Sequence, residues 1–346
     1  MGILDKISKN KKIAEYIFKE EATPKDFINT GCLTLNVLFS GKLDGGIPIG
    51  KVNQIAAPSS LGKSFIGMKV AKNAQKKGLE VIYLDSEFAY DPAFAENVGI
   101  DEKNMLVIQD NQIESLQQTV MQIASEVEKE ERSKILLVID SWGGLVTSKT
   151  VDDATSGKDV SDMTISKKKN SFARLLTGLG FTVFVINQVY DSMNQYDPLA
   201  IGGGRGIYFA SSSIVLGSSK AKNKESSGDI TGAIVTASTK KSRFAKENSK
   251  LKYLINYDGG ISPFYGMLED ALEGGYVEKP SMGWYSRPSV ENDKKWREKD
   301  IYTKEFWGPI ISNTDFKWYV EKKYTFEHSE IADEDFSWDD IEQADA

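Results

Sequence analysis

The sequence has only one cysteine, Cys32, among its 346 residues, so an internal disulfide is excluded. It also has no run long and apolar enough to cross a bilayer or to form the apolar part of a secretory signal. We therefore expect a cytoplasmic protein. With 40% hydrophobic and 27% charged residues, the chain has an ordinary balance for a soluble protein and can bury a substantial core.

Basic residues are missing from the C-terminal end of the chain. From Glu327 to Ala346 there are nine acidic residues and no lysine or arginine. The net charge of the whole chain is −7, so the remainder carries about +2. Such a composition is typical of a mobile acidic segment, which we call the acidic tail. The overall charge therefore does not exclude nucleic acid as a partner.

Internal repeats are absent, but apolar runs alternate with polar helical stretches between about 50 and 190. The runs VNQIAA, VIYLDS, MLVIQ, ILLVID and TVFVIN are short and rich in β-forming residues. This alternation predicts an α/β fold, with a mostly parallel sheet and helices on both faces. The runs SIVLGSS, TGAIVTAST and KLKYLINYD follow too closely for crossover helices, which predicts an antiparallel extension of the sheet.

Two segments flank this predicted core. Residues 1–22 have apolar positions at helical spacing before Thr23 and Pro24, which predicts a short leading helix. An aromatic-rich C-terminal stretch with four tryptophans predicts a small α/β lobe. We divide the chain into an N-terminal arm, a core, a C-terminal lobe and an acidic tail, at 1–30, 31–268, 269–325 and 326–346.

The stretch AAPSSLGKSF differs by one residue from a phosphate-binding loop, because Ala57 stands where that motif has glycine. It lies between a predicted strand and a helix-like stretch, where backbone N–H groups and a helix N-terminus bind phosphate. Ala57 is compatible with this role only if its φ is negative. Lys63 would reach the β- and γ-phosphates, and the Ser64 hydroxyl would bind Mg²⁺. An ordinary turn before a surface helix is the alternative. The expected nucleotide contacts are Pro58, Ser59, Ser60, Leu61, Gly62, Lys63, Ser64 and Phe65.

Polar side chains follow three of the predicted parallel strands. Glu87 comes after VIYLDS, at the sheet edge where ligands bind, and its carboxylate could orient and deprotonate a water. Asp140 is the last residue of the apolar run ILLVID. In P-loop ATPases the acid that binds Mg²⁺ also stands at the end of a buried strand, although an aspartate in this place can instead cap a helix. Asn187 and Gln188 end TVFVIN, where they would either contact a γ-phosphate or form a turn.

Several blocks together carry a resemblance to a known family. YLDSEFAYDPAFAENVGID, VIDSWGGL, VINQ, the glycine loop 202–204 and YDGGISPFYG resemble RecA-family recombinases, most of all their phage UvsX branch. The blocks occur in family order and cover nearly the whole chain. The resemblance implies an ATP-dependent DNA strand-exchange recombinase that forms a helical filament on single-stranded DNA. Such a protein is a DNA-dependent ATPase with ATP and Mg²⁺ as cofactors, and acts in recombination, repair and recombination-dependent replication.

The resemblance also assigns roles around the nucleotide. It makes Glu87 the catalytic base, Asp140 the acid on the Mg²⁺ side, and Gln188 the γ-phosphate sensor at the root of a DNA-binding loop. Asp91 and Phe94 match positions that contact and stack on adenine. A plain core aromatic is the alternative for Phe94.

In this family ATP is hydrolysed between protomers. Lys241 and Arg243 fall where the neighbouring subunit's phosphate-contacting cations lie, so that assembly would activate hydrolysis. A solvated basic surface is the alternative for both residues.

Two stretches without strong periodicity, 148–163 and 189–205, are expected to be loops that bind DNA. Contacts to phosphates carry no base code, so binding should be largely independent of sequence and should weaken steeply with salt. Surface loops that do not bind DNA are the alternative. The candidate contacts are Lys149, Lys158, Lys167, Lys168, Lys169, Gly202, Gly203, Gly204 and Arg205.

The resemblance implies several partners: single-stranded DNA, a homologous duplex, further copies of the chain, a single-strand-binding protein and a mediator. The leading helix would pack on the adjacent subunit or on its own core, and the C-terminal lobe would lie near incoming duplex or serve only as structural core. The acidic tail would compete with DNA for basic surface, or only aid solubility. Two other functions remain open. They are a hexameric RecA-fold DNA helicase and a non-enzymatic nucleotide-binding assembly protein in which Ala57 has abolished turnover.

Overall fold

The computed structural model describes residues 9, 26–157, 162–192, 199–224 and 228–326. The predicted leading helix, the acidic tail from 327 onward and Lys158 lie outside these described residues. In the described part, no helix is long and apolar enough to cross a membrane.

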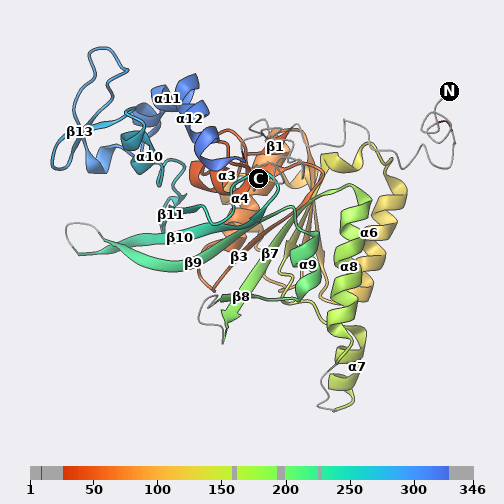
Figure 1. The fold of residues 1–346 in the computed structure, drawn as a ribbon. Coiled ribbons are helices and arrows are strands. Elements are labelled where there is room, and N and C mark those ends of the chain that lie inside the picture. Colours follow the sequence, from red (N-terminus) through yellow and green to blue (C-terminus); the bar gives the residue numbers. More distant parts are fainter. Residues whose placement is uncertain (1–8, 10–25, 158–161, 193–198, 225–227, 327–346) are drawn as a thin grey trace, which may run out of the picture.

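A ten-stranded sheet forms the centre of the molecule (Figure 1). The strands lie in the order β12-β11-β10-β9-β3-β7-β6-β4-β5, and β8 pairs with β7. Five neighbouring strands are mutually parallel, which confirms the predicted parallel sheet. They are β3 (Val52–Ala57), β4 (Glu80–Asp85), β5 (Met105–Gln109), β6 (Ile135–Asp140) and β7 (Thr182–Asp191).

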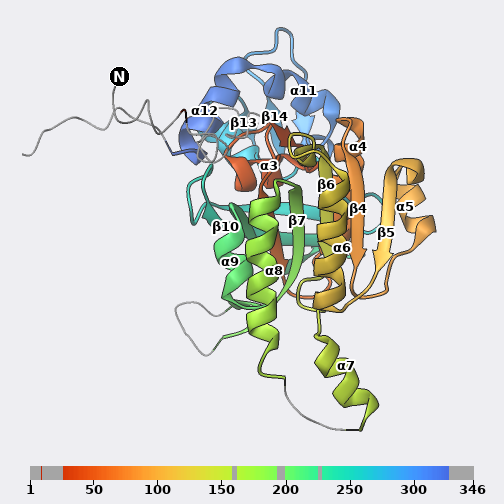
Figure 2. The same cartoon turned by 90° about the vertical axis from the view of Figure 1, so that its right-hand side faces the viewer.

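Helices cover both faces of this sheet. Along β7, Phe184 belongs to one hydrophobic cluster while Val183 and Val185 belong to the other, because successive side chains of a strand point to opposite faces. The first cluster includes α3 (Leu33–Ser40), α4 (Lys63–Lys76) and α5 (Pro92–Val98), and the second includes α6 (Ile113–Glu126) and α8 (Ile165–Leu179). Figure 2 shows α6 and α8 side by side over the sheet.

The other large strands extend the sheet beyond β3. As predicted, β10 (Ile230–Ser242) and β11 (Lys250–Asn256) run antiparallel to their neighbours. β9 (Ser213–Lys224) belongs to this extension as predicted, because it pairs antiparallel with β10, while its other edge runs parallel to β3. This parallel pairing is possible because the chain between β7 and β9 contains α9 (Arg205–Ala210) and so provides a crossover. The short β12 (Gly260–Ile261) completes this edge.

Both stretches expected to be loops contain regular structure. Residues 148–155 form helix α7 (Ser148–Thr155), capped by the Thr147 hydroxyl, which accepts from the Thr150 N–H. None of its eight residues is buried, and so short a stretch gives no helical period that a sequence pattern could reveal. In the second stretch, β7 continues to Asp191 and pairs antiparallel with β8 (Leu199–Ile201). Figure 1 shows α7 and β8 toward the same end of the molecule.

The C-terminal lobe is a small α/β unit, as expected, and joins the cluster that covers α4. Its α12 also contacts α3, near the short pair β1 (Phe27–Ile28) and β2 (Ile47–Pro48). The elements of the lobe are α10 (Leu268–Glu273), β13 (Glu278–Ser281), β14 (Trp284–Ser286), β15 (Trp296–Arg297), α11 (Lys304–Ser312) and α12 (Thr314–Tyr324).

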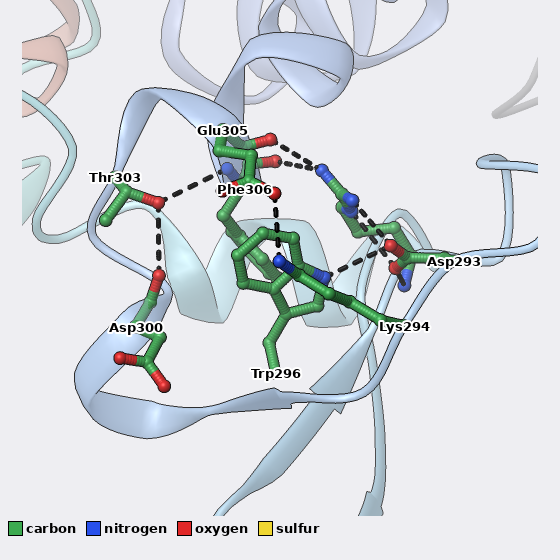
Figure 3. A network of polar contacts seen from close by, with 8 residues as sticks. Asp293, Lys294, Trp296, Asp300, Thr303, Glu305 and Phe306 are labelled. Carbon is green, nitrogen blue, oxygen red and sulfur yellow. Dashed lines mark hydrogen bonds and ion pairs between the residues drawn. The ribbon is translucent and has the colours of Figure 1, made fainter.

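A polar network holds this lobe together (Figure 3). The buried Arg287 pairs with Asp293, which also accepts from the Trp296 indole N–H at 3.1 Å. The Arg287 guanidinium donates to the carbonyls of Glu305 and Phe306 as well, and it stacks on the Trp296 ring. Because its charge is paired and its donors are satisfied, the arginine can be buried. The tryptophan at 296 is therefore a core residue, as expected.

Candidate nucleotide-binding and catalytic site

Parallel strands bring the candidate residues to one edge of the sheet. Ala57 lies opposite Gln188 on the neighbouring strands β3 and β7, and Asp85 lies opposite Asp140 on β4 and β6. Since these strands all point the same way, their carboxyl ends meet at this edge. Glu87 follows two residues after β4. The structure thus places the strand-end residues together, where the sequence predicted a ligand site.

The predicted phosphate loop joins β3 to α4, and two of its residues have a left-handed backbone. Gly62 has a φ of 71° immediately before α4, and Ser60 has a φ of 62°. The Lys63 ammonium donates to the Pro58 carbonyl at 2.9 Å and so lies across the loop. Burial lowers the pKa of Lys63, while Asp140 and Glu87 act in the opposite direction. The exposed Ser59, Ser60 and Ser64 leave the loop open to a phosphate ligand.

The structure explains why Ala57 can replace glycine. Ala57 is the last residue of β3 and keeps a negative φ, as the sequence analysis required. Its methyl group points at Gly217 of β9, where an added Cβ would lie 2.9 Å from the Ala57 Cβ. The missing side chain at 217 therefore makes room for the one at 57. The only signal in the sequence was a glycine inside the strand SIVLGSS, which indicates a close approach.

We expect Gly217→Ala to destabilise the protein by about 1–3 kcal/mol, because it forces two Cβ atoms together in a packed core. The double variant with Ala57→Gly should regain most of this loss, since it moves the methyl group from one strand to the other. Thermal unfolding measures both effects. Gly178→Ala is the matched control, because an added Cβ there meets no atom within 4 Å. Additive losses in the double variant would contradict the pairing.

Glu87 is hydrogen-bonded to two residues from other strands. Gln188 Nε2 donates to Glu87 Oε1 at 3.1 Å, and Ser141 Oγ donates to the same oxygen at 2.6 Å. The two residues for which the resemblance implies a base and a γ-phosphate sensor are therefore in direct contact, which the sequence did not predict. Ser141 was missed, because a serine after a buried strand is common and only the neighbouring strand shows what it contacts.

Asp140 is a buried carboxylate among other acids. Tyr83 donates to Asp140 Oδ2 at 2.7 Å. Burial raises the pKa of Asp140, the hydrogen bonds from Tyr83 and Ser64 oppose this, and the charges of Glu87 and Asp85 raise it further. A cation beside Asp140 and Ser64 would offset this cost, so the pair fits Mg²⁺. The described residues contain no group of three His, Cys, Asp or Glu side chains that could hold a metal ion. Mg²⁺ is commonly bound by one or two protein oxygens together with nucleotide phosphates and waters, which is compatible with this pair.

The residues expected to contact adenine have structural partners. Asp91 Oδ1 caps α5 by accepting from the N–H groups of Ala93 and Phe94 at 2.9 and 3.4 Å. Phe94 packs at the edge of the α4 cluster, with its ring centroid 5.8 Å from that of Phe65. Contact with adenine remains a prediction for both.

The two cations expected to act on a neighbouring subunit differ in their surroundings. Lys241 donates to the carbonyls of Tyr208 and Phe209 at 2.9 and 3.0 Å. Arg243 is exposed and, together with Arg174 and Arg205, lines a cavity of about 460 Å³. We call this cavity the arginine pocket. Sequence reasoning missed Arg174, because its helix brings it to Arg243 only in the folded chain.

The lysines of α8 also differ from one another. Lys168 forms an ion pair with Glu114 of α6, and the buried Lys169 donates to the carbonyls of Trp142 and Gly143 at 3.1 and 3.2 Å. These two lysines hold the structure together locally. Lys149 on α7 and Lys167 on α8 are exposed, and they remain candidates for binding DNA.

The glycine loop packs on its own protein. The Trp142 indole donates to the Gly203 carbonyl at 3.1 Å, and an added Cβ at 203 would lie 2.2 Å from the Trp142 ring. Gly202 N–H donates to the Gln188 carbonyl at 2.9 Å. The close approach of Trp142 accounts for Gly203, an added Cβ at 202 would lie 2.7 Å from the Tyr190 ring, and the backbone bond ties the loop directly to Gln188. Gly204 and Arg205 are exposed.

Comparison with known proteins gives a consistent result. The family model "RecA N-terminal domain" matches residues 4–262, and "Bacteriophage T4, Recombination and repair protein, C-terminal domain" matches residues 264–320. The chain is 31% identical over 337 residues to the "Recombination and repair protein" of Enterobacteria phage T4, covering 93% of this chain and 84% of that protein. It is 25% identical over 315 residues to "Protein RecA" of Clostridium beijerinckii, covering 88% and 82%. A solved structure of the "RadB recombinase" is similar with a TM-score of 0.48 and 18% identity, covering 68% of this chain and 98% of that one.

Proposed function

The chain belongs to the RecA family of recombinases and is an ATP-dependent DNA strand-exchange recombinase with DNA-dependent ATPase activity, and we propose that it works as a filament with ATP bound between subunits. The observation that supports a DNA-dependent hydrolysis site is the contact of Glu87 with Gln188 at the edge that also holds Lys63 and Asp140. It joins a base for hydrolysis to the strand that leads into a proposed DNA-binding hairpin.

The residues of the site have different roles in hydrolysis. Backbone N–H groups of the phosphate loop and the Lys63 ammonium bind the phosphates. Glu87 accepts a proton from the water that attacks the γ-phosphorus, through the carboxylate oxygen that Gln188 leaves open. Ser64 and Asp140 would hold Mg²⁺, which supplies charge neutralisation on the phosphate oxygens.

DNA is proposed to act on this site through Gln188. That residue lies on β7, which continues into the hairpin with β8, and the hairpin bonds to the glycine loop. A strand of DNA bound at the hairpin would therefore move or fix the amide that contacts Glu87. Lys149, Lys167, Gly204 and Arg205 are the proposed DNA contacts, because all four are exposed.

The exposed Lys149 and Lys167 should contribute to the salt dependence of DNA binding, whereas Lys168, which is paired with Glu114, should not. For single-stranded DNA each phosphate contact adds about 0.7 to the slope of log affinity against log salt. We expect Lys149→Ala and Lys167→Ala each to lower that slope by about this amount. Lys168→Ala is the matched control, because Glu114 already neutralises it. Fluorescence anisotropy with labelled oligonucleotides across a salt series measures the slopes, and equal slopes for all three variants would contradict these assignments.

The remaining assignments concern the assembly. We propose that 1–30 is an arm that packs on the next subunit, that 31–268 is the ATPase core, and that 269–325 lies near incoming duplex. The acidic tail is proposed to compete with DNA for basic surface. A single-strand-binding protein and a mediator are the proposed accessory partners.

Electron microscopy on single-stranded DNA with ATP and Mg²⁺ tests the assembly. Helical filaments that cover the DNA are the expected result. Closed six-membered rings would instead support a hexameric helicase, and the DNA-unwinding activity of the same preparation would then decide between the two.

A further inference from the structure

The Glu87 carboxylate is held from one side only. Within the part of the chain that the structure describes, both hydrogen bonds to this side chain end on Oε1, one from Ser141 and one from Gln188. Oε2 is therefore the oxygen that remains for a water molecule. A carboxylate that shares one oxygen with two donors and keeps the other free has a defined orientation.

Ser141 is itself locked in place. Its backbone N–H donates to Ser86 Oγ at 2.9 Å, and Ser86 Oγ donates to the Ser141 carbonyl at 2.7 Å. The Ser141 hydroxyl accepts from the Gly144 N–H at 3.3 Å, so its own proton is directed at Glu87. Ser141 is only 1% exposed, so bulk solvent has little access to its hydroxyl.

The side chains of Glu87 and Gln188 are less constrained than that of Ser141. Glu87 is exposed in the turn after β4, beside Phe88, whose φ is 54°. An exposed glutamate samples many rotamers unless a neighbour fixes it. Gln188 is only partly buried, on the strand that continues into the hairpin with β8. Of the two donors to Glu87, Ser141 is therefore the fixed one and Gln188 the one that a ligand at the hairpin can move.

We propose that Ser141 is a positioning residue for the hydrolytic reaction, holding Glu87 so that Oε2 faces the attacking water. This proposal rests on the proposed role of Glu87 as the base. Ser141 acts through Glu87 and not on the nucleotide. With Ser141 in place, the carboxylate stays anchored through Oε1 while DNA acts on the second hydrogen bond to that oxygen, the one from Gln188.

The test is a comparison of Ser141→Ala with the intact protein in DNA-stimulated ATP hydrolysis. We expect kcat to fall by roughly 10- to 100-fold, because small misplacement of a reacting group is costly. The KM for ATP and the affinity for a fluorescent ATP analogue should stay the same, since the hydrogen bonds described for Ser141 go to Ser86, Glu87 and Gly144 and not to the phosphate loop. Ser141→Cys keeps the shape but is a weaker donor, and it should give an intermediate kcat even if the alanine variant folds poorly.

A double-mutant cycle with Glu87→Gln separates positioning from a merely structural role. In the Glu87→Gln background, Ser141→Ala should cause no further loss of residual activity, because its effect passes through Glu87. Ser213→Ala is the matched control: it removes another buried hydroxyl, one that donates to the Phe39 carbonyl, and kcat should not change.

Three results would overturn the proposal. One is a wild-type kcat in both Ser141 variants, and another is an equal loss from Ser141→Ala in both backgrounds. The third is full activity of Glu87→Gln itself, which would also remove Glu87 from its proposed role. If either of the first two results is observed while Glu87→Gln is strongly impaired, the proposed function stands. Only the positioning role of Ser141 is then rejected.

Discussion

Glu87→Gln is expected to lower DNA-stimulated ATP hydrolysis by about 100- to 10,000-fold, the usual contribution of a general base. Glutamine has the same shape, and its carbonyl oxygen can still accept from Ser141 and Gln188, but it cannot take up a proton. Nucleotide affinity should therefore remain. Lys63→Ala should lose both hydrolysis and nucleotide affinity, because it removes the cation that lies across the phosphate loop. A coupled ATPase assay with and without single-stranded DNA measures the rates.

The control for this experiment is Glu130→Gln, which removes an exposed carboxylate outside the site. It should hydrolyse ATP as the intact protein does. If the intact protein failed to hydrolyse ATP with DNA present and Mg²⁺ in excess, the chain would be a nucleotide-gated binding protein, and Ala57 would be the first residue to examine. If Glu87→Gln kept its activity, another group would have to be the base.

Mixing two inactive variants should restore activity if Arg243 acts on the neighbouring subunit's nucleotide. Arg243→Ala and Glu87→Gln should each hydrolyse ATP at least 100-fold more slowly than the intact protein, by loss of charge stabilisation and of the base respectively. In an equimolar mixture, some interfaces combine an intact Glu87 with an intact Arg243. For random assembly about a quarter of the interfaces are of this kind, so activity should return to roughly a quarter.

The matched control is a mixture of Glu87→Gln with Lys63→Ala. Both defects then lie in the same half of the site, so no interface is complete and no activity should return. An absence of recovery in the Arg243 mixture as well would place this arginine in its own subunit's site or outside the reaction. A parallel mixture with Arg174→Ala reports whether the whole arginine pocket faces the neighbour.

Local patterns were enough to predict the parallel sheet and the position of its ligand edge. Short β-rich runs separated by helical stretches can bury both faces only in a helix-covered parallel sheet, and parallel strands end at a common edge. Glu87, Asp140 and Gln188 were therefore predicted as site residues from their places after apolar runs, and Lys63 from the loop motif. Their convergence follows from strand direction, which the sequence pattern already indicates.

Contacts between distant segments were not predictable in this way. The exposed helix α7 is too short to show a helical period, and the parallel pairing of β9 with β3 depends on a crossover that contains only a short helix. Whether Lys168 is free for DNA depends on Glu114, which is 54 residues away along the chain. Contacts between such distant residues produce no periodic pattern and no motif in the sequence.

The sequence by itself determined the fold class, the phosphate loop and the strand-end residues, because hydrophobic periodicity and motif spacing act over short stretches of chain. Only the tertiary structure decided that Gly217 makes room for Ala57, that Trp142 requires Gly203, and that Ser141 holds Glu87. Each of these depends on which strands and loops become neighbours, and that is set by packing of the whole core and not by any one segment.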